Sequence, residues 1–199
     1  MARPRGFEEK QVLNAVRDQF WNAGYAATSL EDLMRVSGLG KGSLYAAFGD
    51  KRRLFLRALR SYTDDNHDHL RKALTEAPRA VVALRTILEP PIGDPTAAGK
   101  RRGCLMANST LELGNADPEV LDHAHRTYER STALIGDCVA RAQREGDLPA
   151  EADPIALARA LLAAQQGLMF MSRTGMDTAT LTATARSLAN QLLPDPHDG

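Results

Sequence analysis

The chain has 199 residues, of which 43% are hydrophobic, and its 25 Lys and Arg are balanced by 25 Asp and Glu. This length suits one domain of ordinary size or two small domains that share a core. A net charge of zero argues against a nonspecific architectural DNA-binding protein, and the lack of a membrane-length apolar run or an apolar N-terminus predicts a cytoplasmic protein without a membrane partner.

The first predicted helix spans residues 7–22, where hydrophobic residues recur at helical spacing: Val12, Leu13, Val16 and Phe20. A second helix is predicted to begin at Thr28, because Thr28 and Glu31 have the spacing of a capping box. It ends near Ser37, and Gly38 supplies the backbone freedom for a sharp turn.

A third short helix is predicted from Lys41 to Phe48, with Gly40 as its N-cap and with Leu44 and Phe48 facing inward. The outward residues are cationic, hydroxyl-bearing or small: Lys41, Gly42, Ser43, Tyr45, Ala46 and Ala47. Such a face allows a helix to approach the major groove closely. Two helices joined by a glycine-bearing turn predict a helix-turn-helix and double-stranded DNA as the partner.

The next helix begins with three cations, Lys51, Arg52 and Arg53, after Asp50. Cations at a helix start oppose the helix dipole unless an anion lies nearby, and a DNA phosphate is such an anion. The alternative is a solvated turn that Asp50 compensates. Residues 1–60 hold 11 Lys and Arg against 6 Asp and Glu, a net charge of +5, whereas residues 61–199 hold 14 against 19, a net of −5. The N-terminal third is therefore the predicted nucleic-acid end.

Residues 7–60, and above all the pattern KGSLYAAFGDKRRLF, resemble the DNA-binding domain of the TetR family of bacterial transcriptional regulators. The resemblance implies a repressor. It places at or near DNA the residues that match the family's motif, with the tyrosine and the last lysine on phosphates: Thr28, Lys41, Gly42, Ser43, Tyr45 and Lys51. Ala47 departs from the family, which often has a histidine there. Base reading at Ser43 and Ala46 stays open.

The rest of the chain is predicted to be helical. A long connecting helix reaches about Leu74, a helix follows Pro78, and a loop rich in Pro and Gly covers residues 89–103. Later helices are predicted at residues 105–113, 118–144, 154–173 and 178–193. The predicted fold is all-α, with a three-helix helix-turn-helix domain at residues 1–52 and a helical effector-binding and dimerisation domain at residues 53–199.

The last two predicted helices carry hydrophobic stripes at helical spacing: Leu157, Leu161, Ala164 and Leu168, then Leu181, Ala185, Leu188 and Leu192. Two copies would bring these stripes together in a four-helix interface, which is how TetR family members pair. The alternative is that the stripes serve the core of one chain. A two-fold dimer would require a palindromic operator.

A regulator of this kind needs a cavity for a small-molecule effector. The residues predicted to line it are Tyr62, Leu105, Met106, Tyr128, Gln165 and Met169. Since none of them carries a charge, they favour an uncharged or aromatic ligand. The alternative is that they are ordinary core residues.

Cys104 offers a different trigger, because it follows Lys100, Arg101, Arg102 and Gly103 at a predicted helix start. Cations and a helix N-terminus lower the pKa of a thiol, which makes it reactive toward electrophiles or oxidants. The segment RRGCLMANSTLEL resembles a type of C-terminal domain in TetR regulators, some of which use such a cysteine to sense electrophiles or oxidants. The alternatives are a small buried residue or, with His123 or His125 as base, a thiol enzyme.

No other feature supports catalysis, so the chain is predicted not to be an enzyme. Cys138 is predicted to lie in the core. The histidine pairs His67/His69 and His123/His125 are two residues apart, which points their side chains away from one another on a helix. We therefore expect no metal and no cofactor.

Overall fold

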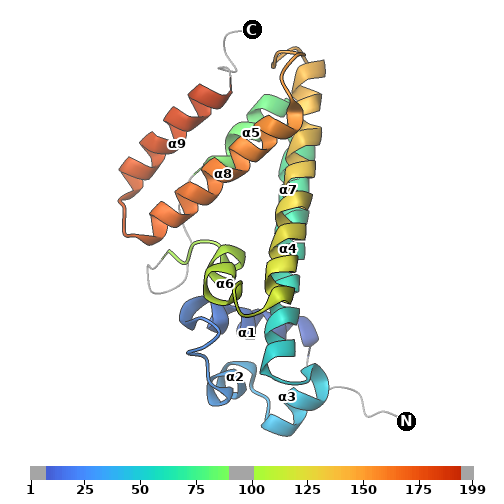
Figure 1. Cartoon of the computed structure of the whole chain (residues 1–199), viewed down its shortest axis with the longest axis vertical. Coiled ribbons are helices and arrows are strands. Elements are labelled where there is room, and N and C mark those ends of the chain that lie inside the picture. The colour runs from blue at the N-terminus through green and yellow to red at the C-terminus, as the bar shows by residue number, and fades with distance from the viewer. Residues whose placement is uncertain (1–7, 90–100, 194–199) are drawn as a thin grey trace, which may run out of the picture. The chain divides into compact units, whose positions relative to one another are not determined.

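The computed structural model describes residues 8–89 and 101–193 and places nine α-helices and no strand among them (Figure 1). The predicted loop at residues 89–103 lies largely outside the described residues. The helices are α1 (Glu9–Ala23), α2 (Leu30–Ser37), α3 (Lys41–Phe48), α4 (Lys51–Glu76), α5 (Ala80–Ile87), α6 (Leu105–Leu113), α7 (Pro118–Arg144), α8 (Pro154–Arg173) and α9 (Thr178–Leu192). The all-α prediction is confirmed.

The described residues form two compact units. The first lies within Met1–Asp65 and Leu105–Ala124, and the second within Asn66–Cys104 and His125–Gly199. Helices α4 and α7 each run from the first unit into the second. The first unit therefore contains α6 and the start of α7 in addition to the helix-turn-helix.

The core of the first unit is aromatic and aliphatic. The predicted α1 stripe is buried, as are Leu33 of α2 and Leu44 and Phe48 of α3. The ring of Phe20 meets that of Phe55 edge-on at 5.1 Å between centroids. Because Leu44 is fully buried, truncating it to alanine should cost about 2–5 kcal/mol of stability.

The start of α2 differs from the prediction by one residue. Ser29, not Thr28, is the N-cap: its hydroxyl accepts from the backbone N–H of Asp32 at 3.1 Å, and Asp32 accepts from the backbone N–H of Ser29 at 3.1 Å. Thr28 is buried and donates its hydroxyl to the carbonyl of Gly24. The predicted Thr28–Glu31 capping box was therefore wrong. The Ser29–Asp32 pair has the same spacing and forms the capping box instead. Gly38 ends α2 in the left-handed conformation, as predicted.

The second unit has one hydrophobic core, to which α5, α7, α8 and α9 contribute. Helices α8 and α9 lie side by side and are joined by a short turn (Figure 1). Three residues of the predicted stripes are buried in this core: Leu161, Leu168 and Ala185. Leu181 is buried outside this cluster, and the remaining stripe residues, Leu157, Ala164, Leu188 and Leu192, pack against the cluster partly buried. The stripe residues therefore contribute to the core of one chain.

Helix α8 is long and apolar enough, by length and composition, to span a membrane. The sequence-based expectation considered uninterrupted apolar runs, whereas α8 interrupts its hydrophobic residues with Arg159 and Gln166. Such a helix is also common in the core of soluble proteins, and α8 buries Leu161 and Leu168 against its own unit. One such helix is weak evidence for a membrane span.

Candidate functional site

Helix α3 presents a small and polar outward face. Lys41, Gly42, Ser43 and Ala46 are exposed, whereas Leu44 and Phe48 anchor the opposite side in the core. A Cβ atom built on Gly42 would meet nothing within 4 Å, so the chain's own packing does not require glycine there. A small residue without an internal packing role suits the close approach of another molecule.

Tyr45 and Lys51 lie beside this face. Tyr45 is half-buried on α3, and Lys51 opens α4. The ammonium of Lys51 lies 4.5 Å from the centre of the Tyr25 ring, a cation–π contact that fixes where this charge is presented. The Tyr25 ring in turn lies 5.0 Å from that of Phe55. The Lys51 ammonium therefore lies over the Tyr25 ring, which itself packs against Phe55.

Thr28, which the resemblance places at the DNA, has its hydroxyl occupied inside the chain by the Gly24 carbonyl and is 1% exposed. The exposed residue at this helix start is Ser29. Sequence reasoning missed Ser29 because two overlapping capping patterns compete there.

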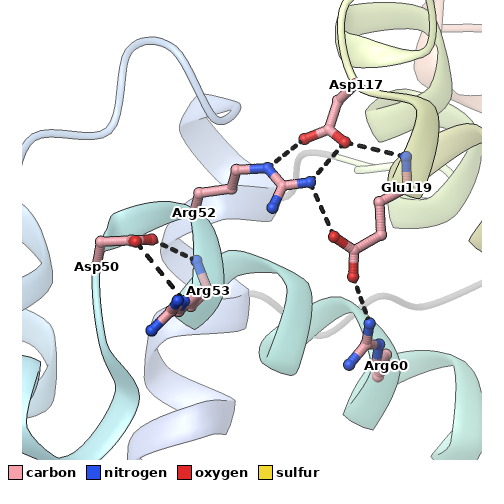
Figure 2. A network of polar contacts seen from close by, with 6 residues as sticks. All are labelled: Asp50, Arg52, Arg53, Arg60, Asp117 and Glu119. Atoms are coloured by element: carbon pink, nitrogen blue, oxygen red, sulfur yellow. Dashed lines mark hydrogen bonds and ion pairs between the residues drawn. The ribbon is translucent and has the colours of Figure 1, made fainter.

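The three cations at the start of α4 have different surroundings. Arg52 donates to Asp117 through Nε at 2.7 Å and Nη2 at 2.8 Å, and its Nη2 also reaches Glu119 at 2.9 Å (Figure 2). Arg53, by contrast, lies 3.9 Å from Asp50, and its side chain is 74% exposed. Asp50 caps the helix by accepting from the backbone N–H of Arg53 at 2.8 Å.

The paired charges around Arg52 shift one another's protonation. The hydrogen bonds that the Arg52 guanidinium donates to Asp117 and Glu119 raise its pKa. The same contact with Arg52 holds the pKa of Asp117 below its usual range. Both groups therefore stay charged throughout the physiological pH range.

Sequence profiles place this helix-turn-helix in a known family. Residues 12–58 match the family described as bacterial regulatory proteins, tetR family. Residues 83–188, more than half of the chain, match the tetracyclin repressor-like C-terminal domain. The chain belongs to the TetR family. It is therefore a DNA-binding transcriptional regulator, and the sequence-based assignment is confirmed.

Individual TetR relatives are similar along most of their length. The uncharacterized HTH-type transcriptional regulator YezE of Bacillus subtilis (strain 168) is 32% identical over 183 residues, which cover 89% of this chain and 92% of YezE. The HTH-type transcriptional repressor ComR of Escherichia coli (strain K12) is 26% identical, over 92% of this chain and 88% of ComR.

A solved relative includes DNA. A cysteine mutant of the TetR family regulator CifR, complexed with 26-bp double-strand operator DNA, is 29% identical and superposes with a TM-score of 0.80. The match covers 94% of this chain and 98% of CifR.

The second unit contains a cavity of about 500 Å³, open to solvent, that residues of α7 and α8 line. Its lining residues are His125, Tyr128, Glu129, Thr132, Ala133, Ile155, Arg159, Leu162, Ala163 and Gln166. The Oε1 atom of Gln166 is buried and has no hydrogen-bond partner among the described residues. A buried acceptor without a donor leaves room for one on a ligand.

Only one of the six residues predicted for the effector pocket lines this cavity, namely Tyr128. Gln165 and Met169 lie on α8 but not in this lining, and the neighbour Gln166 takes the place of Gln165. Tyr62, Leu105 and Met106 are buried in the first unit, where the backbone N–H of Leu105 donates to the Tyr62 hydroxyl at 3.4 Å. These three residues lie outside this lining. The cavity also carries charged side chains, which the candidate list did not anticipate.

Cys104 is half-buried and interacts with Tyr128 by a side-chain hydrogen bond. Burial, followed by the Cys104 sulfur, raises the pKa of the Tyr128 phenol. The neighbouring Arg101 does not remain free beside the thiol, because it donates to the carbonyl of Met176 at 2.6 Å. Cys138 is buried as predicted, and burial raises the pKa of its thiol.

His67 and His123 have partners within the protein. His67 is buried and its Nε2 lies 3.1 Å from both the Thr127 carbonyl and the Ser131 hydroxyl. His123 lies 3.0 Å from the Thr63 hydroxyl. Within residues 8–89 and 101–193, no group of three or more His, Cys, Asp or Glu side chains is placed to hold a metal ion.

Proposed function

We propose that the protein is a homodimeric repressor that holds a palindromic operator and releases it when a small molecule binds the second unit. The observation that carries the operator half of this proposal is the α3 face, where Lys41, Gly42, Ser43 and Ala46 are exposed over a buried anchor. The named relative ComR is a repressor, and the CifR structure holds operator DNA. In this proposal residues 1–52 bind DNA, and residues 53–199 bind the effector and the second copy.

Roles on the operator follow from side-chain chemistry. Tyr45 and Lys51 contact phosphates, and Lys41, Ser43 and Ala46 face the base edges, with Gly42 allowing close approach. Thr28 supports the start of α2 from inside, and the exposed Ser29 hydroxyl, which donates to Asp32 at 2.7 Å, caps the same helix. A cytoplasmic location and the absence of catalysis fit a regulator of this kind.

The proposed dimer uses the outward faces of α8 and α9. Phe170 is 64% exposed on α8, one helical turn after the exposed Gly167, and α9 carries the exposed small residues Ala179 and Ala183. A large exposed aromatic side chain and exposed small residues suit helix packing between copies. Sedimentation equilibrium of the wild type and of Phe170→Asp tests this: a dimeric wild type and a monomeric variant are expected, and a monomeric wild type would contradict the dimer.

The proposed effector lies in the α7–α8 cavity. Its apolar wall, which includes Ile155 and Leu162, suits an apolar body, and the Gln166 acceptor calls for a hydrogen-bond donor on the ligand. Binding that displaces α7 would reach the first unit, because α7 is continuous from Pro118 to Arg144.

A second candidate for the trigger is oxidation or alkylation of Cys104. Two observations favour it: the half-buried Cys104 thiol has a hydrogen bond with Tyr128, and the CifR complex carries cysteine substitutions. Modifying the sulfur would break this hydrogen bond to Tyr128 of α7.

One experiment tests the operator proposal and separates the two triggers. Binding to DNA upstream of the protein's own gene is measured for the wild type and Cys104→Ser, with and without hydrogen peroxide or a mild electrophile. Release of the wild type but not of the variant assigns the signal to Cys104. If both remain bound, Cys104 is rejected as the trigger and small ligands of the cavity are tested next. If neither prefers this DNA to random DNA, the self-regulated operator is rejected.

A further inference from the structure

Arg52 is the most heavily bonded cation at the start of α4. It donates two hydrogen bonds to the Asp117 carboxylate and a third to Glu119 (Figure 2). Glu119 also accepts a hydrogen bond from Arg60 at 2.6 Å. The planar guanidinium matches a carboxylate in this paired geometry, which fixes direction as well as distance.

The acidic partners are themselves fixed at the start of α7. Oδ1 of Asp117 accepts from the backbone N–H of Glu119 at 3.1 Å, and the Asp117 carbonyl accepts from Val120 and Leu121. The Asp117 side chain is 14% exposed. The group that binds Arg52 is therefore a helix cap with little freedom to follow a moving partner.

The position of Arg52 determines what this contact controls. Only Gly49 and Asp50 separate α3, which ends at Phe48, from α4, and Arg52 is the second residue of α4. The contact therefore joins the start of α7 to the turn between α3 and α4, close in sequence to the α3 face that the proposed function places on DNA.

Arg53 provides the contrast. It follows Arg52 by one residue, its side chain is 74% exposed, and its ion pair with Asp50 is long at 3.9 Å. Three cations at this helix start would serve equally as phosphate contacts if only charge mattered. The structure divides them: Arg53 remains available to an outside anion, whereas Arg52, whose side chain is 44% exposed, is already paired with two carboxylates.

We propose that Arg52 is a positioning residue, which Asp117 and Glu119 hold so that helix α7 orients α3 through the first turn of α4, and that Arg52 is not a phosphate contact. The inference rests on the proposed operator binding. It also gives the start of α7 a role in regulation, because any event that withdraws Asp117 and Glu119 releases the turn that follows α3.

The test compares Arg52→Gln, Arg53→Gln and Asp117→Asn, where asparagine can still cap α7. Operator affinity is measured by fluorescence anisotropy over a range of KCl concentrations, and thermal unfolding verifies that each variant is folded. Each phosphate contact contributes about 0.9 to the slope of log affinity against log salt, so Arg53→Gln should reduce the slope of a dimer by about 2.

Arg52→Gln and Asp117→Asn should both weaken operator binding, by roughly tenfold, with the slope unchanged. The Asp117 variant is decisive because it removes a negative charge. If Arg52 were a phosphate contact held back by Asp117, Asp117→Asn would tighten binding, and Arg52→Gln would lower the slope as Arg53→Gln does. Either result overturns the proposal.

A measurement without DNA separates this inference from the proposed function. Amide hydrogen exchange across α3 and the first turn of α4 should accelerate about tenfold in Arg52→Gln and Asp117→Asn but not in Arg53→Gln. Unchanged exchange in all three variants refutes the positioning role even if the operator is never found. A wild type that shows no operator preference while exchange responds as expected refutes only the proposed function.

Discussion

Glu112 of α6 accepts hydrogen bonds from the backbone N–H groups of Tyr25, at 2.9 Å, and of Ala26, at 2.7 Å. Tyr25 and Ala26 lie in the turn between α1 and α2, 87 and 86 positions before Glu112 in the sequence. One carboxylate thus satisfies two backbone donors that no helix uses. It ties α6, the helix that follows Cys104, to the first turn of the DNA-binding unit.

Replacing Glu112 by alanine should lower the free energy of unfolding by about 1–2 kcal/mol, since two charge-assisted hydrogen bonds at a partly exposed site are lost. Glu112→Gln keeps one acceptor oxygen and should lose about half as much. Urea denaturation measures both. If the alanine variant is as stable as the wild type, the carboxylate does not hold this turn.

Ser29→Ala should cost about 1 kcal/mol, because the N-cap hydroxyl of α2 is lost. Ser43→Ala is the matched control. Ser43 is exposed on α3, and its replacement should change stability by less than about 0.5 kcal/mol. Thermal unfolding compares the two variants, and equal stabilities would show that Ser29 is not the cap.

Local sequence signals predicted most helix ends correctly. Gly40, Pro118 and Pro154 mark starts that the structure places where they were predicted, because caps and prolines act on neighbouring residues. The start of α2 was misplaced for the same local reason, since Thr28–Glu31 and Ser29–Asp32 satisfy one pattern at adjacent positions.

Contacts between distant segments could not be predicted from the sequence. Arg52 meets Asp117 across 65 positions, and no periodicity in either helix indicates that partner. The cavity shows the same limit: adjacent helical residues point about 100° apart, so hydrophobic spacing could not distinguish Gln165 from Gln166. The stripes on α8 and α9 were recognised, but which partner they faced required coordinates.

Gln166→Leu should be neutral or stabilising by up to about 1 kcal/mol, because it removes a buried acceptor that has no donor. The same change should abolish binding of a cavity ligand that donates to this oxygen. Gln165→Leu, one residue away and outside this lining, is the control for the helix. A clearly destabilised Gln166→Leu would mean that the amide has an essential partner.

The Tyr128 phenol should keep its proton at pH values where an exposed tyrosine, with a pKa of about 10, has lost half of its protons. Burial is the main cause, and the contact with Cys104 adds to it. Because the folded pKa is raised, the contribution of this group to stability is full below about pH 10 and is lost as the pH rises through the folded value.

Ultraviolet difference absorbance of tyrosinate tests this in the wild type and Tyr128→Phe. Up to about pH 10 the two titration curves should coincide, and the wild type should show extra amplitude only at higher pH. A loss of amplitude in the variant below pH 10 would mean that Tyr128 titrates as an exposed phenol.

The central claim is that the outward face of α3 reads an operator, and Ala46→Glu tests it most directly. Ala46 is exposed, and glutamate is a good helix former, so the fold should persist while a negative charge meets the DNA. Ala73→Glu makes the same change at an exposed position of α4. Anisotropy with DNA from upstream of the protein's own gene should show affinity reduced about a hundredfold or more for Ala46→Glu and nearly unchanged for Ala73→Glu. Wild-type affinity in Ala46→Glu would contradict the account.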